Sequence, residues 1–187
     1  MRIIHAFPSS QAALHTWISR LRLTPDTPHP SLSVHSPGRR VFTEDFVAYS
    51  YGTHFPLVRW MPEHKAFLLN IDRYSATTSK HQREAGGLAI QYAPYLNAHV
   101  FHLSYGRGTS WLPELHTEDA LAHYHDNIRN LLGKARRARL ACRKTWMREH
   151  AESWITELNQ FIRTFKVDAP ELPEDVTAAL VALKLAA

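Results

Sequence analysis

The sequence contains a single cysteine, Cys142, among 187 residues. One thiol excludes a disulfide within the chain and any zinc site built from several cysteines, and it favours a reducing compartment. The sequence also lacks an uninterrupted apolar run of membrane-spanning length, and its first residues, MRIIHAFPSSQ, lack the apolar segment of a signal peptide. We therefore expect a cytoplasmic protein that does not enter a membrane.

Metal-binding motifs are missing as well, although the chain has 13 histidines. His99 and His102 are three residues apart on an expected strand and so point to opposite faces. His123 and His125 are two residues apart on an expected helix and also face apart. Because there is no H-E-x-x-H pattern and no cysteine cluster, we expect no metal and no other cofactor.

The overall composition is that of an ordinary globular protein. Hydrophobic residues make up 44% of the chain and charged residues 21%. The length fits one domain, or one domain with a helical extension. A formal charge of +5 and an isoelectric point near 9.5 favour acidic partners such as nucleic acid.

The order of strand and helix patterns predicts the fold class. Strand patterns lie before Tyr105, and helical patterns dominate after Thr117. This segregation predicts an α+β fold, with a small, mainly antiparallel sheet and a helical, basic C-terminal half, instead of a repeating βαβ fold. We expect residues 1–115 to form the α+β domain and residues 116–187 a helical extension that packs on it as one unit.

Local patterns place individual elements within this frame. We expect an edge strand at Arg2–Phe7, a helix from an N-cap at Ser9 or Ser10 to about Leu23, and a proline-rich loop over 24–40. We then expect strand material over 42–60 with a bulge or bend at 52–56, a turn over 61–65, and a strand over 66–72. Next come a helix over about 80–92, weakened by Gly86-Gly87 and ended by Pro94, a strand over 98–105, and a linker over 111–115.

A run of hydroxyl, amine and imidazole groups stands where the strand over 66–72 passes into the following helix. Ser79 and Gln82 match a capping box, which predicts that the helix begins there. Free N–H groups at a helix start, beside hydroxyls and a lysine, form an anion site, here made of Thr77, Thr78, Ser79 and Lys80. The structural alternative is that these hydroxyls only cap the helix and bond backbone groups of the turn.

The same region contains the candidate catalytic residues His54, Tyr74, Lys80 and His81. If the hairpin pairs with its turn near Glu63, they would converge together with Tyr51. Two imidazoles, a lysine and a tyrosine around a phosphate suit metal-independent phosphodiester cleavage, with one imidazole as base and the other as acid.

The helical half has a strong charge bias, because eight basic residues and no acidic residue lie between Arg129 and Arg148. Placed on one continuous helix, the apolar stripe comprises Ile128, Leu131, Ala135, Ala138, Cys142 and Trp146, which predicts that Cys142 is a core residue. The rest of the helix surface carries Arg129, Lys134, Arg136, Arg137, Arg139, Arg143, Lys144 and Arg148. This surface is either a solvated helix face or a contact surface for phosphates or for carboxylates of another protein.

Two strings in the first half of the chain resemble the motifs of a known domain. They are SYGTHFP at Ser50–Pro56 and NIDRYSATTSKHQ at Asn70–Gln82, and they resemble a small domain found in uncharacterised proteins of bacteriophages, prophages and plasmids. The resemblance implies a mobile-element protein in the cytoplasm of a bacterial host, and it implies no catalytic residue. Small accessory proteins of such elements often bind nucleic acid or block host defences such as CRISPR–Cas complexes, so it also suggests an anti-CRISPR-like role by analogy.

Two functional hypotheses follow. In the first, a non-catalytic protein uses its basic helical half to bind nucleic acid or an acidic surface of a host nucleoprotein complex. In the second, an enzyme cleaves phosphodiesters at the His54/His81 cluster and holds its substrate along the basic helix. We prefer the first hypothesis because no carboxylate pair and no metal-ligand set accompanies the cluster. The oligomeric state follows from neither hypothesis.

Overall fold

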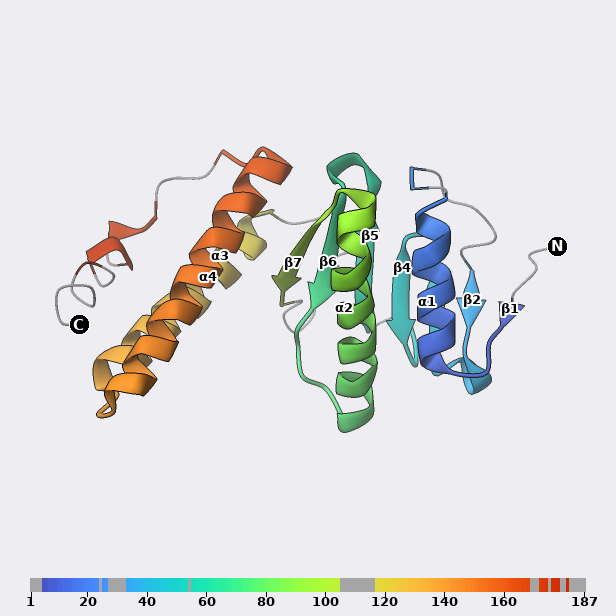
Figure 1. Cartoon of the computed structure of the whole chain (residues 1–187), viewed down its shortest axis with the longest axis horizontal. Coiled ribbons are helices and arrows are strands. Elements are labelled where there is room, and N and C mark those ends of the chain that lie inside the picture. The colour runs from blue at the N-terminus through green and yellow to red at the C-terminus, as the bar shows by residue number, and fades with distance from the viewer. Residues whose placement is uncertain are drawn as a thin grey trace. The chain divides into compact units, whose positions relative to one another are not determined.

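The chain folds into two compact units, Met1–Ser110 and Trp111–Ala187. The computed structural model describes residues 5–23, 25–26, 33–53, 55–104, 117–168, 172–174, 176–178 and 181. The first unit contains a sheet and two long helices, and the second contains a pair of long helices (Figure 1). The packing of the second unit on the first stays a prediction.

The first unit alternates short strands with two helices. Its strands are β1 (His5–Ala6), β2 (Val34–His35), β3 (Val41–Glu44), β4 (Val47–Ser50), β5 (Pro56–Met61), β6 (Ala66–Asn70) and β7 (His99–Leu103). Its α-helices are α1 (Ser10–Leu21) and α2 (Ala76–Leu96). It also has two short 3-10 helices, η2 (Pro37–Arg39) and η3 (Pro62–His64). Among the described residues these strands form one sheet in the order β1-β2-β3-β4-β5-β6-β7. The expected α+β class is therefore confirmed.

Most strand pairs in this sheet are antiparallel, as expected, but both edge pairs are parallel. β2 to β6 form a meander, whereas β1 pairs with β2 and β6 pairs with β7 in parallel. A parallel pair of neighbours needs a crossover connection, which α1 supplies at one edge and α2 at the other. The two helices agree with the prediction from the sequence, whereas the parallel pairing was not predicted.

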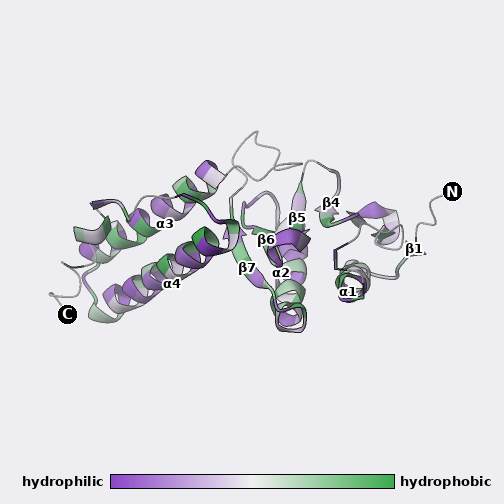
Figure 2. Cartoon of the chain, turned by 90° about the horizontal axis from the view of Figure 1, so that it is seen from above, coloured by the Kyte–Doolittle hydropathy of each residue, from purple (hydrophilic) through white to green (hydrophobic). Residues whose placement is uncertain are grey.

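The two crossovers place their helices on the same face of the sheet. Four antiparallel steps separate β2 from β6, so these two strands run in the same direction. Both crossovers therefore step along the sheet in the same sense, and the usual right-handed connection directs both helices to one face. α1 and α2 pack against each other there, as the two views in Figure 1 and Figure 2 show.

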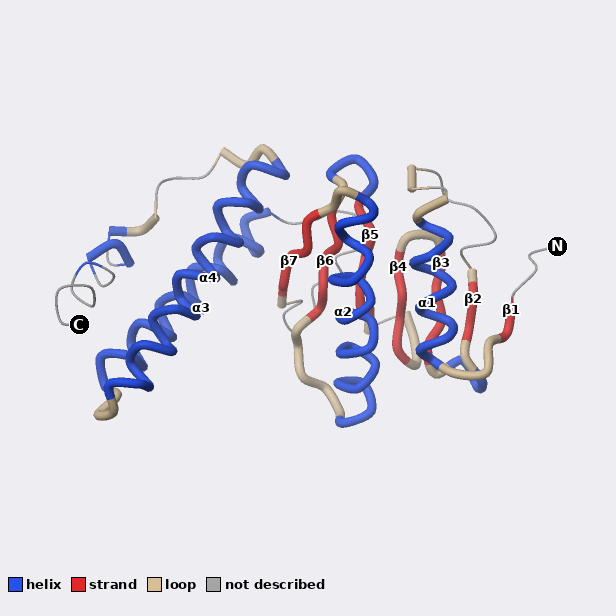
Figure 3. Tube along the Cα trace, viewed as in Figure 1, coloured by secondary structure: helices blue, strands red, loops and turns tan. Residues whose placement is uncertain are grey.

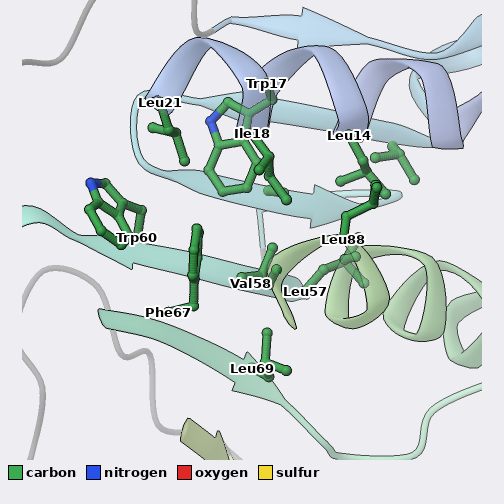
Figure 4. Close-up of a cluster of buried hydrophobic side chains, with 14 of the residues drawn as sticks. Leu14, Trp17, Ile18, Leu21, Leu57, Val58, Trp60, Phe67, Leu69 and Leu88 are labelled. Atoms are coloured by element: carbon green, nitrogen blue, oxygen red, sulfur yellow. The ribbon is translucent and has the colours of Figure 1, made fainter. Parts of the chain in front are cut away.

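The main core lies between this helix pair and the sheet. The buried residues of α1 follow helical spacing and are Ala13, Leu14, Trp17, Ile18 and Leu21. They face apolar side chains of β5, β6 and α2, including Leu57, Val58, Trp60, Phe67, Leu69 and Leu88 (Figure 4). Burying each large side chain stabilises the fold by about 1.5–3 kcal/mol. The Trp17 indole N–H also donates to the backbone carbonyl of Asp45 at 2.9 Å.

Two segments differ from the sequence-based expectation in the first half of the unit. The proline-rich segment is not wholly a loop, because it contains β2 and η2. Thr43 makes β2 possible, since its hydroxyl accepts from the Val34 N–H at 3.0 Å. The strand-rich segment contains an additional hairpin, β3–β4, whose turn has Asp45 at a φ of 48°. Pro56, the last residue of the expected bulge or bend, is the first residue of β5, and the register of the β4–β5 pair shifts between Ala48 and Tyr49.

Helix α2 begins earlier and ends later than predicted. Its N-cap is Ser75, whose hydroxyl accepts from the Thr78 N–H at 3.1 Å, so the predicted capping box at Ser79 is wrong. The helix also continues through Pro94 to Leu96. A proline in the last turn removes only one backbone bond, and the left-handed Asn97 then closes the helix. The predicted strand that follows is confirmed as β7.

The second unit is a helical hairpin of α3 (Thr117–Arg137) and α4 (Ala141–Phe165). The two helices pack along their length, and a short connection joins them (Figure 3). Their shared core comprises Ala120, Tyr124, Ile128, Leu132, Ala135, Met147, Ala151, Leu158 and Phe161. Burial raises the pKa of Tyr124, and its hydroxyl donates to a carboxylate oxygen of Glu157 at 2.9 Å. Among the described residues, no helix is long and apolar enough to cross a membrane.

Candidate functional site

A buried imidazole connects three elements at one end of the sheet. His81, in the second turn of α2, is only 4% exposed. Its Nδ1 lies 2.8 Å from the hydroxyl of Ser50, the last residue of β4, and its Nε2 lies 3.5 Å from the hydroxyl of Ser10, the first residue of α1. The ring of Tyr51 lies 5.6 Å from the imidazole. The two strings that carry the motif resemblance therefore meet in space at His81.

Burial lowers the pKa of His81, because the charged imidazolium loses its hydration. The nearby Glu84 carboxylate raises this pKa, while Lys80 and Arg40 lower it further. The net direction is downward, so the imidazole is neutral at pH 7. A neutral ring carries one N–H donor and one acceptor nitrogen, and it is therefore able to act either as a structural hydrogen-bond partner or as a general base.

A pocket of about 390 Å³ opens beside His81. Its lining includes the start of α1, the segment at η2 and one side of α2: Pro8, Ser9, Ser10, Gln11, Ser36, Pro37, Arg40, Thr77, Lys80, His81 and Glu84. The ionic groups are two cations and one carboxylate. Lys80 Nζ lies 3.9 Å from one carboxylate oxygen of Glu84, whereas the other, Oε2, is buried without a hydrogen-bond partner. The pocket is thus a polar site with a net positive lining.

The predicted anion-binding residues are placed differently from the expectation. Thr77, Thr78, Ser79 and Lys80 lie in the first turns of α2, and the cap is upstream of them. The N–H of Thr78 is already used by Ser75, whose hydroxyl also donates to the Thr78 hydroxyl at 2.9 Å. Of the four, Thr77 and Lys80 line the pocket of His81, and Ser79 lines a different pocket. Thr78 is therefore held by the helix cap, although its hydroxyl bonds the Ser75 side chain and not a backbone group.

Gln82 has a structural role in the same region. Its amide donates to the backbone carbonyls of Asn70 and Asp72, at 2.9 and 2.7 Å. Asn70, only 3% exposed, donates to the Pro56 carbonyl and accepts from the Asp72 N–H, both at 2.9 Å. These bonds fix the chain between β6 and α2. Much of the polar motif thus satisfies backbone groups that have no strand or helix partner.

The predicted catalytic group is only partly assembled in the described residues. His54 lies outside them. Tyr74 is 73% exposed, and its ring lies 5.5 Å from Phe55 and not against His81. Lys80 and His81 share a pocket, as expected. The pairing of two imidazoles that the cleavage hypothesis requires stays a prediction.

Three residues of this site were not expected from the sequence: Ser10 and Arg40, which line the pocket, and Ser50, which bonds His81. Ser10 was expected only as a possible helix cap, and it lies 71 residues from His81 along the chain. Ser50 belongs to the first resemblance string, but the string gives no indication of its partner. Tyr51 has a backbone φ of 60°, which is unfavourable for a bulky residue, and its N–H donates to the Arg40 carbonyl at 2.9 Å. No local pattern reveals these long-range contacts.

The basic residues of the helical half do not lie on one helix. The predicted continuous stripe is wrong, because α3 ends at Arg137 and α4 begins at Ala141. Six cations therefore gather around the connection, all of them exposed, and we call them the basic tip: Lys134, Arg136, Arg137, Arg139, Arg143 and Lys144. Arg129 lies further down α3 and is 3.6 Å from Asp126, and Arg148 is half-buried in α4.

The basic tip lacks the ion pairs that would neutralise it. No carboxylate of the described residues lies within 4.0 Å of its six side chains. Lys134, Arg136 and Arg137 suit the negative end of the α3 dipole. Arg143 and Lys144, in contrast, lie at the positive end of α4, where the N-cap Leu140 supplies no side-chain acceptor and the first turn has no acidic residue. An anion bound at this position would reduce the repulsion between these cations. It would also supply the acceptor that the Leu140 side chain lacks.

Exposed apolar groups adjoin the basic tip. Trp146 is 53% exposed, and its ring stacks on His150 with centroids 4.5 Å apart and planes inclined by 25°. Leu140 is 65% exposed. Cys142 is also exposed, so its predicted place in the core is wrong. The tip therefore combines unpaired cations with a flat aromatic surface.

The comparisons with known proteins give no relative: no protein-family model, no curated protein and no solved structure matches this chain. The described residues also contain no group of three or more histidine, cysteine, aspartate or glutamate side chains that could hold a metal ion.

Proposed function

We propose that this protein binds single-stranded nucleic acid through the basic tip of the α3–α4 hairpin. The observation that carries the proposal is the set of six exposed cations without a carboxylate partner among the described residues. Like charges at this density repel one another, and contacts with phosphates would neutralise them. Binding is also favoured because the nucleic acid releases its counterions.

The aromatic surface favours a nucleic acid over an acidic protein surface. Trp146 and His150 present their stacked rings within the first three turns of α4, next to Arg143 and Lys144. Proteins that bind single strands combine a cationic track with aromatic rings on which the bases stack. A carboxylate-rich protein partner would need the cations but not an exposed indole. Unpaired bases are available in a single strand and not in a duplex, so the proposal specifies the single strand.

The motif resemblance supplies the biological setting of the proposal. A nucleic-acid-binding accessory protein of a mobile element would act on the nucleic acid of the element itself, or on the nucleic acid held by a host nucleoprotein defence complex such as CRISPR–Cas. The chemistry of the basic tip is the same in both cases, because in each it contacts phosphates and unpaired bases.

The test is a binding titration with labelled single-stranded and double-stranded oligonucleotides that carry no 5′-phosphate. We expect the single strand to bind more tightly, and Trp146→Ala to weaken its binding by about 1–3 kcal/mol, the contribution of one stacked base. Tyr95→Ala is the matched control, since Tyr95 is 66% exposed but belongs to the other unit. Equal affinity for duplex and single strand, unaltered by Trp146→Ala, would contradict the proposed stacking.

A second candidate function is metal-independent phosphodiester cleavage in the His81 pocket. The observation that favours it is a neutral, buried imidazole beside a pocket that also presents Arg40, Lys80 and the Ser10 hydroxyl. The cations would hold a phosphate, and the imidazole would accept the proton of the attacking hydroxyl. This candidate still requires a second proton-transfer group to protonate the leaving oxygen.

The cleavage hypothesis is tested with labelled DNA and RNA in the presence of EDTA. If cleavage occurs, Lys80→Ala and Ser10→Ala should reduce turnover by at least about 10²-fold while the four-alanine tip variant (Arg136, Arg137, Arg143 and Lys144 to alanine) reduces only substrate affinity. Lys80 is exposed, so its removal does not open the core. Absence of cleavage of every substrate by the parent protein rejects this candidate and leaves binding as the function.

A further inference from the structure

Two consecutive glycines occupy the middle of α2, and the space around one of them, Gly87, does not require a glycine. Glycine is a poor helix former, second only to proline. The sequence suggested that Gly86-Gly87 serves either a kink or close packing, yet α2 is one unbroken helix. A Cβ added to Gly86 would meet only the Leu69 side chain, at an ordinary 3.4 Å, and one added to Gly87 would meet nothing within 4 Å. Neither explanation therefore accounts for Gly87.

Both glycines instead line a cavity of about 590 Å³ in the first unit. This volume is within the usual range of small-molecule sites. The lining comes from the end of β6, the segment after it, one side of α2, and β7: Leu69, Asn70, Ile71, Arg73, Ser79, Gln82, Arg83, Gly86, Gly87, Ile90 and His102. It is separate from the His81 pocket, with which it shares no lining residue.

The charged groups of this cavity are of one sign. Arg73 and Arg83 contribute guanidinium groups, and the lining contains no carboxylate. Neither arginine forms an ion pair or a side-chain hydrogen bond with another residue that the structure describes. The amides of Asn70 and Gln82 are already used by backbone partners. The two guanidinium groups are thus the charged recognition groups of the cavity, and they suit the oxygens of a phosphate.

The apolar part of the lining is partly exposed. Ile90 is 55% exposed and Ile71 38% exposed, although both belong to the cavity lining. In the same lining, the missing Cβ atoms of Gly86 and Gly87 leave bare helix backbone, on which a planar ring is able to lie. A ligand that buries this surface would also remove exposed isoleucine side chains from water.

We propose that this cavity binds a nucleotide, with its planar base over the Gly86-Gly87 step and its phosphate at Arg73 and Arg83. A free mononucleotide and the 5′-phosphorylated end of a strand present the same chemistry. The site lies wholly in the first unit, so the proposal does not depend on the basic tip of the hairpin. It explains why the helix retains a glycine at position 87, where a larger side chain fits the empty cavity but would exclude the ligand.

The decisive variant is Gly87→Leu, which fills the cavity and improves helix propensity at the same time. Its matched control is Gly133→Leu, because Gly133 lies inside α3 and an added Cβ would meet only the flexible end of Arg137, at 3.9 Å. Both substitutions should raise the thermal midpoint by about 2–4 °C, since each replaces a helix glycine. If Gly87→Leu raises the thermal midpoint and abolishes ligand binding, Gly87 is needed for the ligand and not for the stability of the helix.

Calorimetric titrations with AMP, GMP, CMP and UMP and with the corresponding nucleosides test the ligand class. We expect at least one mononucleotide to bind, its nucleoside and the Arg83→Ala variant to show affinity about tenfold to a hundredfold lower, and Gly87→Leu to lose binding. Gly133→Leu should bind like the parent. The four-alanine tip variant is also titrated with a 5′-phosphorylated oligonucleotide and with its unphosphorylated form. Tighter binding of the phosphorylated form would identify a strand end as the ligand.

The outcome is informative in either direction. Failure of all four mononucleotides and of the phosphorylated strand end to bind would overturn the proposal, as would unchanged binding in Gly87→Leu. A failure of nucleotide binding in the cavity would not contradict the proposed function. Strand binding at the basic tip is measured separately, with unphosphorylated oligonucleotides.

Discussion

The buried polar side chains of the first unit and the cations at the tip of the second unit differ in burial and in hydrogen bonding. In the first unit, Ser50, Asn70 and His81 are at most 4% exposed, and each is hydrogen-bonded. In the second unit, the six cations of the basic tip are exposed and have no carboxylate partner in the described part of the chain. Residues of the first kind stabilise the fold, whereas those of the second kind contribute little to it.

The comparison shows why the most distinctive sequence motif is not automatically the functional site. Buried polar groups need partners, so a segment that runs from β6 into α2 requires many hydroxyl and amide groups merely to satisfy its backbone. The cations at the start of α4, Arg143 and Lys144, have no such structural explanation. We therefore assign the partner-binding role to the basic tip and regard the polar motif as the support of a pocket.

The largest effect on stability is expected from Asn70→Ala. This change removes the side chain that bonds both the buried Pro56 carbonyl and the partly buried Asp72 N–H, so each of these two backbone groups loses a hydrogen bond. We expect a loss of about 2–4 kcal/mol in the free energy of unfolding, measured by urea denaturation. The control is Asn130→Ala on the exposed face of α3, where a change under about 0.5 kcal/mol is expected. Similar losses in both variants would refute the contrast between the units.

A smaller effect is expected from acidification, through His81. Its pKa is lowered in the folded state by burial, so the unfolded chain binds the proton more readily below its usual pKa of about 6.5. The contribution of His81 to stability is therefore complete above that pH and is lost as the pH falls through the lower, folded-state pKa. Thermal unfolding followed from pH 8 to pH 5 should show a shallower acid loss in His81→Gln than in the parent. An identical pH profile would show that His81 is not the group that resists protonation.

The smallest effect on stability is expected from the four-alanine tip variant. All four side chains are exposed, and their removal relieves repulsion at the start of α4. We expect the midpoint of urea unfolding to stay the same or to rise slightly, within about 0.5 kcal/mol per residue. A marked loss of stability would mean that the basic tip is part of the fold and would weaken its assignment as a contact surface.

The elements that local patterns predicted well are those whose signals are local. α1 has an N-cap serine and regular apolar spacing, and β6 and β7 are short apolar strands next to recognisable turns. The start of α2 was misplaced because Ser75 and Ser79 both resemble caps. The choice between them depends on Gln82, which bonds the carbonyls of Asn70 and Asp72 instead of closing a capping box. That contact is fixed only once β6 and α2 have packed.

The break between α3 and α4 has no glycine or proline signal, yet the phase of the apolar residues indicates it. At about 100° per residue, Cys142 and Trp146 continue the stripe of Ala135, whereas Met147 lies about 120° away from it. The structure buries Met147 and exposes the other two, so the apolar stripe restarts with a new helix. The candidate site was harder still to predict, because the contact of Ser10 with His81 joins residues far apart in the chain.

The most direct test of the central claim is the salt dependence of single-strand binding in the parent and in the four-alanine tip variant. Six phosphate contacts predict a slope of about −4 for the logarithm of the binding constant against the logarithm of the salt concentration, and the two contacts left in the variant predict about −1. The parent should also bind much more tightly at low salt. The same slope in both proteins, or binding that does not respond to salt, would contradict the assignment of the basic tip as the nucleic-acid contact surface.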